Sequence, residues 1–408
     1  MQKIIGPFIQ LIDMANLPAK GPIKSEQLNI IQHAAVIVED GNIVATGKFT
    51  DLAHRYPKAI LEEMEGEYVL LPGFVDCHTH ICWAGSRAND YGARLDGKTY
   101  LEIAEAGGGI WSTVTNTRQA TEAELIKGTV QRANHHLKNG VTTVEVKSGY
   151  GLGIEEELKI LKAIQAANKI THADLVSTCL AAHMKPKDFS GSNSDYLELL
   201  INDLLPKLLS EELTNRIDIF IEKSAFTTTE ALHYLNKAQQ MGFAITVHGD
   251  QFSVGGSEVA VKVNALSVDH LEASGQQEIE LVATSNTVAV ALPGASIGLG
   301  MEFTPARKIL DLGGALAIGS DWNPGSAPMG DLLTQASILG TYEKLSIAET
   351  LAGLTTRAAA ALGIQNIGSI EVSNLADFQA YPVDDYREIF YNQGRIKPSK
   401  VWKRGVEV

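Results

Sequence analysis

The sequence has no long hydrophobic run, and this shortage excludes a membrane protein. No apolar stretch among the 408 residues approaches the roughly 20 that a helix needs to cross a bilayer. The segment after Met1 carries an acidic residue and prolines instead of the charged start and apolar core of a signal peptide. We therefore predict a cytoplasmic protein without a membrane partner.

Basic residues and cysteines are also scarce. Lysine and arginine number 34 against 48 acidic residues, so the net charge is −14, whereas nucleic-acid binding depends on basic surface. We expect no nucleic-acid partner, and an anionic substrate would need a local arginine. Cys77, Cys82 and Cys179 are an odd number without zinc-ribbon spacing, which argues against a disulfide framework. A buried, unreactive thiol is the favoured interpretation for Cys77.

From residue 69 to about 371, apolar β-branched runs alternate with helical stretches. This alternation is typical of βα units around a parallel sheet. The eight candidate strands are residues 70–75, 141–146, 175–181, 217–221, 244–247, 265–268, 287–292 and 315–318. Eight parallel strands with intervening helices predict a closed (β/α)8 barrel, the TIM-barrel fold of the α/β class.

Both ends of the chain carry short β-like segments. Asp40-Gly41-Asn42 lies between two apolar runs and predicts a hairpin turn. Similar β-like runs return at residues 376–381 and 400–402. We predict that residues 1–66 and 372–408 together form one small β domain, and that residues 67–371 form the barrel inserted between them.

The long connection after the first strand, residues 81–140, is predicted to cover the barrel mouth and to contact substrate. Within it, Thr121 and Glu124 predict a capping box at a helix start, and Gly140 a left-handed residue at the end. Gly107-Gly108-Gly109 lacks the preceding strand and the Lys-Ser/Thr of a phosphate-binding loop. It therefore predicts a loop or helix stop.

Histidines and an aspartate stand at the ends of the predicted barrel strands. His78 and His80 follow the first strand and project to the same side, because side chains alternate along a strand. His248 ends the fifth strand, His270 the sixth, and Asp321 the eighth. A lone histidine at a strand end is more often structural, but this coincidence of strand ends favours a metal site. Chemistry in such barrels collects at the carboxyl ends of strands.

The candidate metal ligands are His78, His80, His248 and Asp321. They suit one Zn²⁺ or iron ion (Fe²⁺ or Fe³⁺) better than magnesium and leave a position for water. Such an ion lowers the pKa of bound water from about 15.7 toward 7. Asp321 could accept the proton of that water, and His270 could orient the water or shuttle protons. Glu222 or Lys223, after the fourth strand, could bridge a second ion, but a single metal is favoured.

These residues resemble the amidohydrolase superfamily, metal-dependent hydrolases on a distorted (β/α)8 barrel with a small β-sandwich domain from both chain ends. The resemblance rests on Pro72-Gly73-Phe74-Val75-Asp76-x-His78-Thr79-His80, on the strand-end His248 and His270, and on Gly319-Ser320-Asp321. Segments 84–87, 105–114, 145–151, 181–183 and 320–326 are similar to the imidazolonepropionase family within it. That family opens 4-imidazolone-5-propanoate to N-formimidoyl-L-glutamate in histidine degradation.

The resemblance implies substrate contacts and catalytic residues as well as the four metal ligands. The implied substrate contacts are Arg87, Tyr150, His183, Gln251, Asn323, Gly325 and Ser326. Arg87 offers a planar fork suited to the propanoate carboxylate. Many relatives are expected to carry glutamate at the position of Gln251. The candidate catalytic residues are Asp321, His270 and Gln251. Because an amide cannot act as a general base, Gln251 would only form a hydrogen bond to the substrate.

The sequence thus predicts a metal-dependent hydrolase that cleaves the cyclic C–N bond of a small anionic imidazolone, assembled as a homodimer. Two alternatives share the same barrel and metal ligands. One is an aminohydrolase that deaminates a cytosine- or guanine-like base. The other is a binding or scaffold protein that has lost catalysis.

Overall fold

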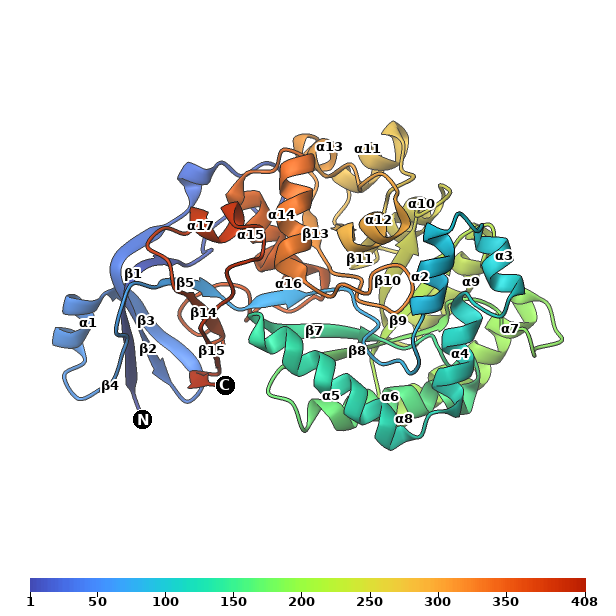
Figure 1. The fold of residues 1–408 in the computed structure, drawn as a ribbon, viewed down its shortest axis with the longest axis horizontal. Helices are drawn as coiled ribbons and strands as arrows, with labels where there is room; N and C mark the ends of the chain where they lie inside the picture. The colour runs from blue at the N-terminus through green and yellow to red at the C-terminus, as the bar shows by residue number, and fades with distance from the viewer.

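The computed structural model describes residues 1–408, apart from the side chains of Tyr100, Leu101 and Ala104. It has two parts, a parallel barrel and a separate mixed sheet that contains both chain ends (Figure 1). The predicted fold class, an α/β barrel with a small β domain from both ends, is confirmed.

Eight parallel strands form the barrel sheet, and their spatial order is their order in the chain. They are β6 (Phe74–Asp76), β7 (Val141–Lys147), β8 (Asp174–Ala182), β9 (Arg216–Ile221), β10 (Ala244–Gly249), β11 (Ser267–His270), β12 (Val288–Ala291) and β13 (Leu316–Ile318). Each predicted barrel strand overlaps one of them. The carboxyl ends of the strands therefore meet at one face, as the site prediction requires.

The prediction of one continuous first strand over residues 70–75 is wrong. The chain leaves the mixed sheet after β5 (Val69–Pro72) and enters the barrel at β6, with Gly73 between. A Cβ at Gly73 would lie 2.3 Å from Oγ1 of Thr142, so the crossing requires glycine. Because β5 and β6 are both fully buried, hydrophobic pattern alone does not reveal the change of sheet.

The first and last strands of the barrel, β6 and β13, are joined by hydrogen bonds at and just after their carboxyl ends. The backbone N–H of Asp321 donates to the carbonyl of His78 (2.9 Å), and that of His80 to the carbonyl of Trp322 (3.0 Å). The Ser320 N–H donates to Oδ1 of Asp76 (2.9 Å). We call this joint the seam; it is built from the segments that carry candidate metal ligands.

Helices connect the barrel strands and cover the outside of the barrel (Figure 1). They are α2 (Ala88–Leu95), α3 (Tyr100–Glu105), α4 (Ile110–Gln119), α5 (Glu122–Lys138), α6 (Ile154–Asn168), α7 (Asn193–Leu199), the π-helix η2 (Leu200–Leu204), α8 (Leu205–Ser210), α9 (Thr228–Gln240), α10 (Gly256–Lys262), α11 (Gln276–Thr284), α12 (Pro293–Leu299), α13 (Ala306–Asp311), α14 (Leu332–Tyr342), α15 (Ile347–Leu354) and α16 (Thr356–Ala361). The predicted capping box of Thr121 and Glu124 begins α5. Gly107-Gly108-Gly109 separates α3 from α4, as predicted.

The mixed sheet joins strands from both chain ends in the order β16-β15-β14-β5-β1-β2-β3, with β4 paired to β1. Its strands besides β5 are β1 (Lys3–Ile12), β2 (Ile30–Glu39), β3 (Asn42–Lys48), β4 (Ile60–Glu63), β14 (Phe378–Tyr381), β15 (Lys400–Lys403) and β16 (Val406–Glu407). The short helix α1 (Phe49–Arg55) packs on this sheet, whereas η1 (Ser25–Gln27) contacts α15 and α17 (Arg387–Tyr391) contacts α14. The predicted hairpin at Asp40 and Gly41 joins β2 to β3, and both turn residues have positive φ.

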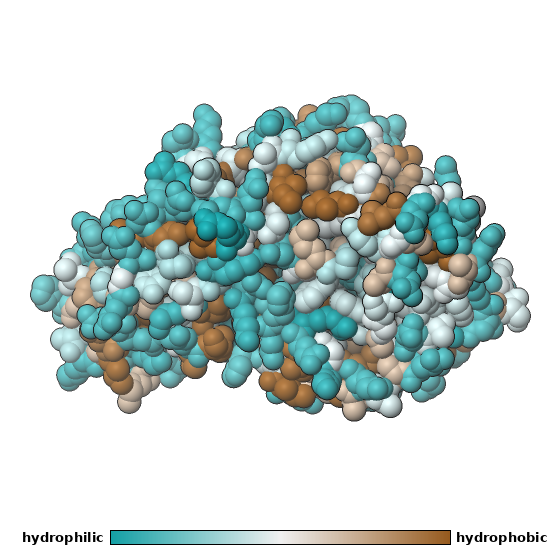
Figure 2. All heavy atoms as spheres, viewed as in Figure 1, coloured by the Kyte–Doolittle hydropathy of each residue, from teal (hydrophilic) through white to brown (hydrophobic). Residues whose placement is uncertain are grey.

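Each part has its own buried core. Trp402 is fully buried in the mixed sheet and packs edge-on against Phe8, with ring centroids 6.2 Å apart. Hydrophilic side chains cover most of the face shown in Figure 2, and hydrophobic ones form scattered groups. No helix among the described residues has the length and apolar character of a membrane span.

Candidate active site

Three histidines predicted as metal ligands come together at the carboxyl ends of the barrel strands. His78, His80 and His248 each offer a ring nitrogen within 4.8 Å of the others, and all three are buried. Nε2 of His80 and Nε2 of His248 are 3.4 Å apart. Two imidazole nitrogens so close, at neutral pH and out of water, favour a shared cation between them.

Carboxylates behind two of these histidines fix how their rings are protonated. Nδ1 of His78 lies 2.6 Å from Oδ2 of Asp269, and Nδ1 of His248 lies 2.8 Å from Oδ2 of Asp218. Each carboxylate accepts a hydrogen bond from Nδ1–H, so Nδ1 carries the hydrogen and Nε2 keeps its lone pair. This arrangement of carboxylate, histidine and metal recurs in metalloenzymes. The buried Nε2 of His78 has no hydrogen-bond partner among the described residues, so the donor set fits a metal ion.

Asp321 completes the group from the other side of the seam. Its Oδ1 lies 3.4 Å from Nε2 of His80 and 3.5 Å from Nε2 of His78. Burial alone would raise the pKa of Asp321, but the hydrogen bond from His80 and the surrounding histidines hold it below its usual range. Its φ of +51° is unusual for a residue other than glycine, and such strain is concentrated at functional sites.

Burial keeps two histidines of the cluster, His248 and His78, neutral. It lowers the pKa of His248 to about 4, although Asp218 acts in the opposite direction. Burial, together with the charge of Lys147, lowers the pKa of His78 well below its usual value. A metal ion binds neutral imidazole, so the protein holds these rings in the form that ligation requires.

His270 differs from the other histidines of the site. Burial alone would lower its pKa, but the carboxylate of Glu272, 3.4 Å from Nδ1, raises it above the usual value. His270 has a φ of +89° and lies 5.4 Å from His248 between ring centroids. It is therefore a residue that can carry a proton beside the metal cluster.

Comparison with known proteins agrees with this geometry. The model of the amidohydrolase family matches residues 69–408. An imidazolonepropionase of Bdellovibrio bacteriovorus is 40% identical over 391 residues, which are 95% of this chain and 91% of the relative. An imidazolonepropionase of Clostridium tetani is 36% identical over 394 residues, which are 96% of this chain and 94% of the relative. The chain belongs to the imidazolonepropionase family of amidohydrolases.

A solved structure of another hydrolase has the same fold as this amidohydrolase. A triazine hydrolase variant superimposes with a TM-score of 0.76 at 16% sequence identity, covering 100% of this chain and 94% of the other. This likeness concerns the fold alone. The amidohydrolase family is one of metal-dependent hydrolases, in agreement with the histidine cluster.

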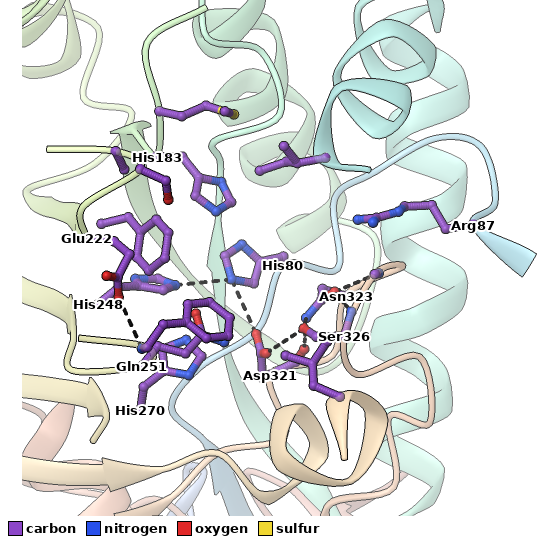
Figure 3. A pocket seen from close by; sticks show the side chains of 18 of the residues that line it. His80, Arg87, His183, Glu222, His248, Gln251, His270, Asp321, Asn323 and Ser326 are labelled. Atoms are coloured by element: carbon purple, nitrogen blue, oxygen red, sulfur yellow. Dashed lines mark hydrogen bonds and ion pairs between the residues drawn. The ribbon is translucent and has the colours of Figure 1, made fainter. Parts of the chain in front are cut away.

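A cavity of about 960 Å³ lies next to the histidine cluster. The predicted substrate contacts Arg87, Tyr150, His183, Gln251, Asn323, Gly325 and Ser326 all line it, together with His80, His248, His270 and Asp321. Arg87 points into the cavity from the side opposite Glu222 and His248 (Figure 3). The predicted connection over residues 81–140 supplies further wall residues from its first half, including Arg94 and Ile110.

Arg87 is held by an acidic neighbour and by a close glycine. Its Nε donates to Oδ2 of Asp90 (2.8 Å), and the same oxygen accepts the N–H of Gly109 (2.8 Å). A Cβ on Gly325 would lie 2.3 Å from Nη1 of Arg87. The Nη edge of the guanidinium is therefore fixed beside Gly325, where it can bind a carboxylate.

Asn323 orders the loop that carries Asp321. Its Nδ2 donates to the carbonyl of Asp321 (2.7 Å) and to Oγ of Ser326 (2.8 Å), and its Oδ1 accepts the N–H groups of Gly325 and Ser326. Ser326 in turn donates from Oγ to Oδ2 of Asp321 (3.2 Å). Asn323 lines the cavity, but these internal bonds occupy its amide.

Tyr150 and His183 form the wall next to His80. The ring of His183 stacks on that of His80 at 5.7 Å, and Tyr150 lies 5.8 Å from both. Burial and the two neighbouring histidines, His80 and His248, lower the pKa of His183 to about 3. Its Nδ1 donates to the carbonyl of Gly149 (3.1 Å), which leaves Nε2 as an acceptor for substrate.

Glu222, considered as a bridging ligand, makes its hydrogen bonds to the loop after β10. Its carboxylate accepts the N–H groups of Phe252 and Ser253, both at 3.1 Å. Glu222 lines the cavity. Among the described residues, however, the side chains close enough together to bind one metal ion are those of His78, His80 and His248. A single-metal site remains the prediction.

Cys77, next to His78, is buried, and its Sγ faces the carbonyl of Ile318 at 3.9 Å. Burial raises the pKa of the thiol well above its usual value. A thiolate nucleophile is therefore not available at this position.

Sequence patterns alone did not identify the charged layer behind the ligands. It consists of Glu145, Lys147, Asp218 and Asp269, all buried. A signal was present, because Glu145 and Lys147 stand two apart in a strand that is buried at every position. Alternation places both side chains on the same face, inside the barrel, where charges are stable only when paired.

Proposed function

We propose that the protein hydrolyses the cyclic C–N bond of 4-imidazolone-5-propanoate to give N-formimidoyl-L-glutamate, a step of histidine degradation. The observation that carries the proposal is one cavity with two chemically different ends. One end holds the histidine cluster with Asp321, and Arg87 forms the opposite wall (Figure 3). The relatives of 36–40% identity are imidazolonepropionases, and the arginine favours an anionic substrate over a neutral base.

His78, His80, His248 and Asp321 would hold the metal ion, for which we propose zinc or iron. When bound, such an ion polarises a carbonyl and makes a water molecule acidic enough to attack at neutral pH. Arg87 binds the propanoate and so fixes the ring at the cluster. Tyr150 and His183 confine the ring against the cavity wall, and Gln251 offers an amide hydrogen bond.

Protons move through Asp321 and His270. The low pKa of Asp321 keeps its carboxylate ionised, so it can accept the proton of the attacking water. The water oxygen forms a bond to the ring carbonyl carbon, and the bond from that carbon to nitrogen breaks. The departing nitrogen takes a proton, and His270, whose pKa the carboxylate of Glu272 raises, is the residue we assign to donate it. A homodimer and a cytoplasmic location remain predictions from the sequence.

The direct test is to incubate the purified, metal-loaded protein with 4-imidazolone-5-propanoate and follow the ultraviolet absorbance of the imidazolone. We expect the absorbance to fall and N-formimidoyl-L-glutamate to appear by mass spectrometry. Cytosine and guanine serve as comparison substrates, with ammonia release as the readout. Unchanged imidazolone absorbance in a protein shown to contain metal would refute the proposal, and ammonia release would favour the deaminase.

Gly325→Ala should raise KM for the imidazolone by about 10-fold or more, with a smaller effect on kcat. The new Cβ would displace the flexible end of Arg87 rather than the backbone, and hydrogen bonds to charged groups contribute ~1.5–3 kcal/mol. Steady-state kinetics measures both constants. Gly92→Ala in α2 is the matched control, because a Cβ there meets no atom within 4 Å. An unchanged KM in Gly325→Ala would contradict the carboxylate role of Arg87.

Gln251→Glu should change kcat only modestly and raise KM. Proton transfer is assigned to Asp321 and His270, so a new carboxylate is not needed, and it repels an anionic substrate. The measurement is kcat and KM across pH for wild type and variant. A rise in kcat of about 10²-fold, the contribution of a general base, would show instead that the amide limits the reaction.

A further inference from the structure

A lysine is buried inside the barrel directly behind the candidate metal ligands. Lys147, the last residue of β7, is fully buried. Its Nζ lies 2.8 Å from Oδ2 of Asp218, 2.8 Å from Oε2 of Glu145 and 3.5 Å from Oδ2 of Asp269. The ammonium group has three N–H donors and no acceptor, so its donors match the three carboxylates in number.

In two of these carboxylates, a single oxygen contacts both the lysine and a candidate metal ligand. Oδ2 of Asp218 contacts Lys147 and also Nδ1 of His248 at 2.8 Å. Oδ2 of Asp269 contacts Lys147 and also Nδ1 of His78 at 2.6 Å. One ammonium group therefore connects two carboxylates, and each carboxylate orients one histidine of the cluster.

The third carboxylate anchors the lysine from its own strand. Glu145 accepts the hydroxyl of Thr178 on Oε1 (2.6 Å), and Arg216 lies 3.6 Å from the same oxygen. Its other oxygen, Oε2, is the one that contacts Lys147. Lys147 is thus held on three sides, from β7, β9 and β11, which leaves its ammonium little freedom to move.

We propose that Lys147 is a positioning residue for the metal site: it holds Asp218 and Asp269 in the orientation that aims Nε2 of His248 and of His78 at the ion. The inference rests on the proposed metal site, because it acts only through those two histidines. A buried cluster of charges is a poor way to stabilise a fold, since apolar residues of similar volume usually do as well or better. Its placement behind two ligands indicates a function in metal binding.

Lys147→Met tests the inference, because methionine keeps much of the length and loses the charge. Lys403→Met is the matched control: Lys403 is also buried among carboxylates, 2.6 Å from Oδ2 of Asp174 and in contact with Asp377, but in the mixed sheet. The affinity of each full-length protein for Zn²⁺ is measured by competition with a chromophoric chelator, alongside thermal unfolding of the metal-free form.

We expect Lys147→Met to weaken Zn²⁺ binding by about 10- to 100-fold, the usual effect of losing a partner that orients a ligand. Lys403→Met should destabilise the metal-free protein without changing Zn²⁺ affinity. Unchanged affinity in Lys147→Met would overturn the inference. Tighter binding would also overturn it, because repulsion between Lys147 and the ion would then outweigh positioning.

His78→Ala and His248→Ala separate this inference from the proposed site. If neither variant weakens Zn²⁺ binding, the proposed metal site is wrong. If both do and Lys147→Met does not, only the role of Lys147 is wrong. Should Lys147→Met fail to fold, the double variant Glu145→Gln/Lys147→Gln, which removes one charge of each sign, takes its place with the same expected loss of affinity.

Discussion

Asp321→Asn should lower kcat by about 10²- to 10⁴-fold, the range for loss of a general base. Asparagine matches aspartate in shape and can still accept the hydroxyl of Ser326, so the loop should keep its place. Its amide oxygen cannot take a proton from water, and its lack of charge weakens metal binding. Kinetics at saturating metal, with the metal content of each sample measured, separates the two effects.

The control for this prediction is Asp384→Asn, which removes an exposed carboxylate outside the cavity. It should leave both kcat and metal content at the wild-type level. Ser326→Ala, which removes one hydrogen bond to Asp321, should have a far smaller effect than Asp321→Asn. If Asp321→Asn retains most of the wild-type kcat with a full complement of metal, another group accepts the proton.

Removing the metal with a chelator should abolish the activity and lower the melting temperature. Nε2 of His80 lies 3.4 Å from Nε2 of His248 and 3.4 Å from Oδ1 of Asp321, so a shared ion would tie together segments that follow three different barrel strands. An ion present at 100 times its Kd stabilises the folded state by about 2.7 kcal/mol. Calorimetry and the imidazolone assay, before and after chelation, measure both changes.

Zinc or iron added back should restore activity, and the ion that restores it at the lower concentration is the better candidate for the native metal. The double variant His78→Ala/His248→Ala is the control, since its melting temperature should not respond to added metal. A chelated enzyme that keeps its activity while lacking metal by elemental analysis would contradict the proposed chemistry.

Local patterns were enough to predict the barrel and the cluster. The strands alternate with helices at regular intervals, and His248, His270 and Asp321 stand where apolar runs end. In a barrel, the ends of all strands meet at one face, so sequence position translates directly into spatial proximity. The cavity-lining positions of Arg87 and Tyr150 follow instead from the resemblance to the imidazolonepropionase family, not from this pattern.

Other features depend on contacts that no local pattern contains. Lys147, Asp218 and Asp269 come from three strands and are stable in the interior only because they meet. Asn323 is predicted to contact substrate, and no local pattern shows that its amide also orders the turn that follows it. The crossing at Gly73 is set by Thr142, almost 70 residues later in the chain.

The seam limits which substitutions the barrel can tolerate. Closure of the barrel and presentation of Asp321 and His80 depend on the same backbone hydrogen bonds, so a mutation cannot alter one without endangering the other. His183 follows β8, away from the seam. A substitution at His183 can therefore reshape the cavity wall without breaking the hydrogen bonds that close the barrel and hold Asp321 and His80 in place.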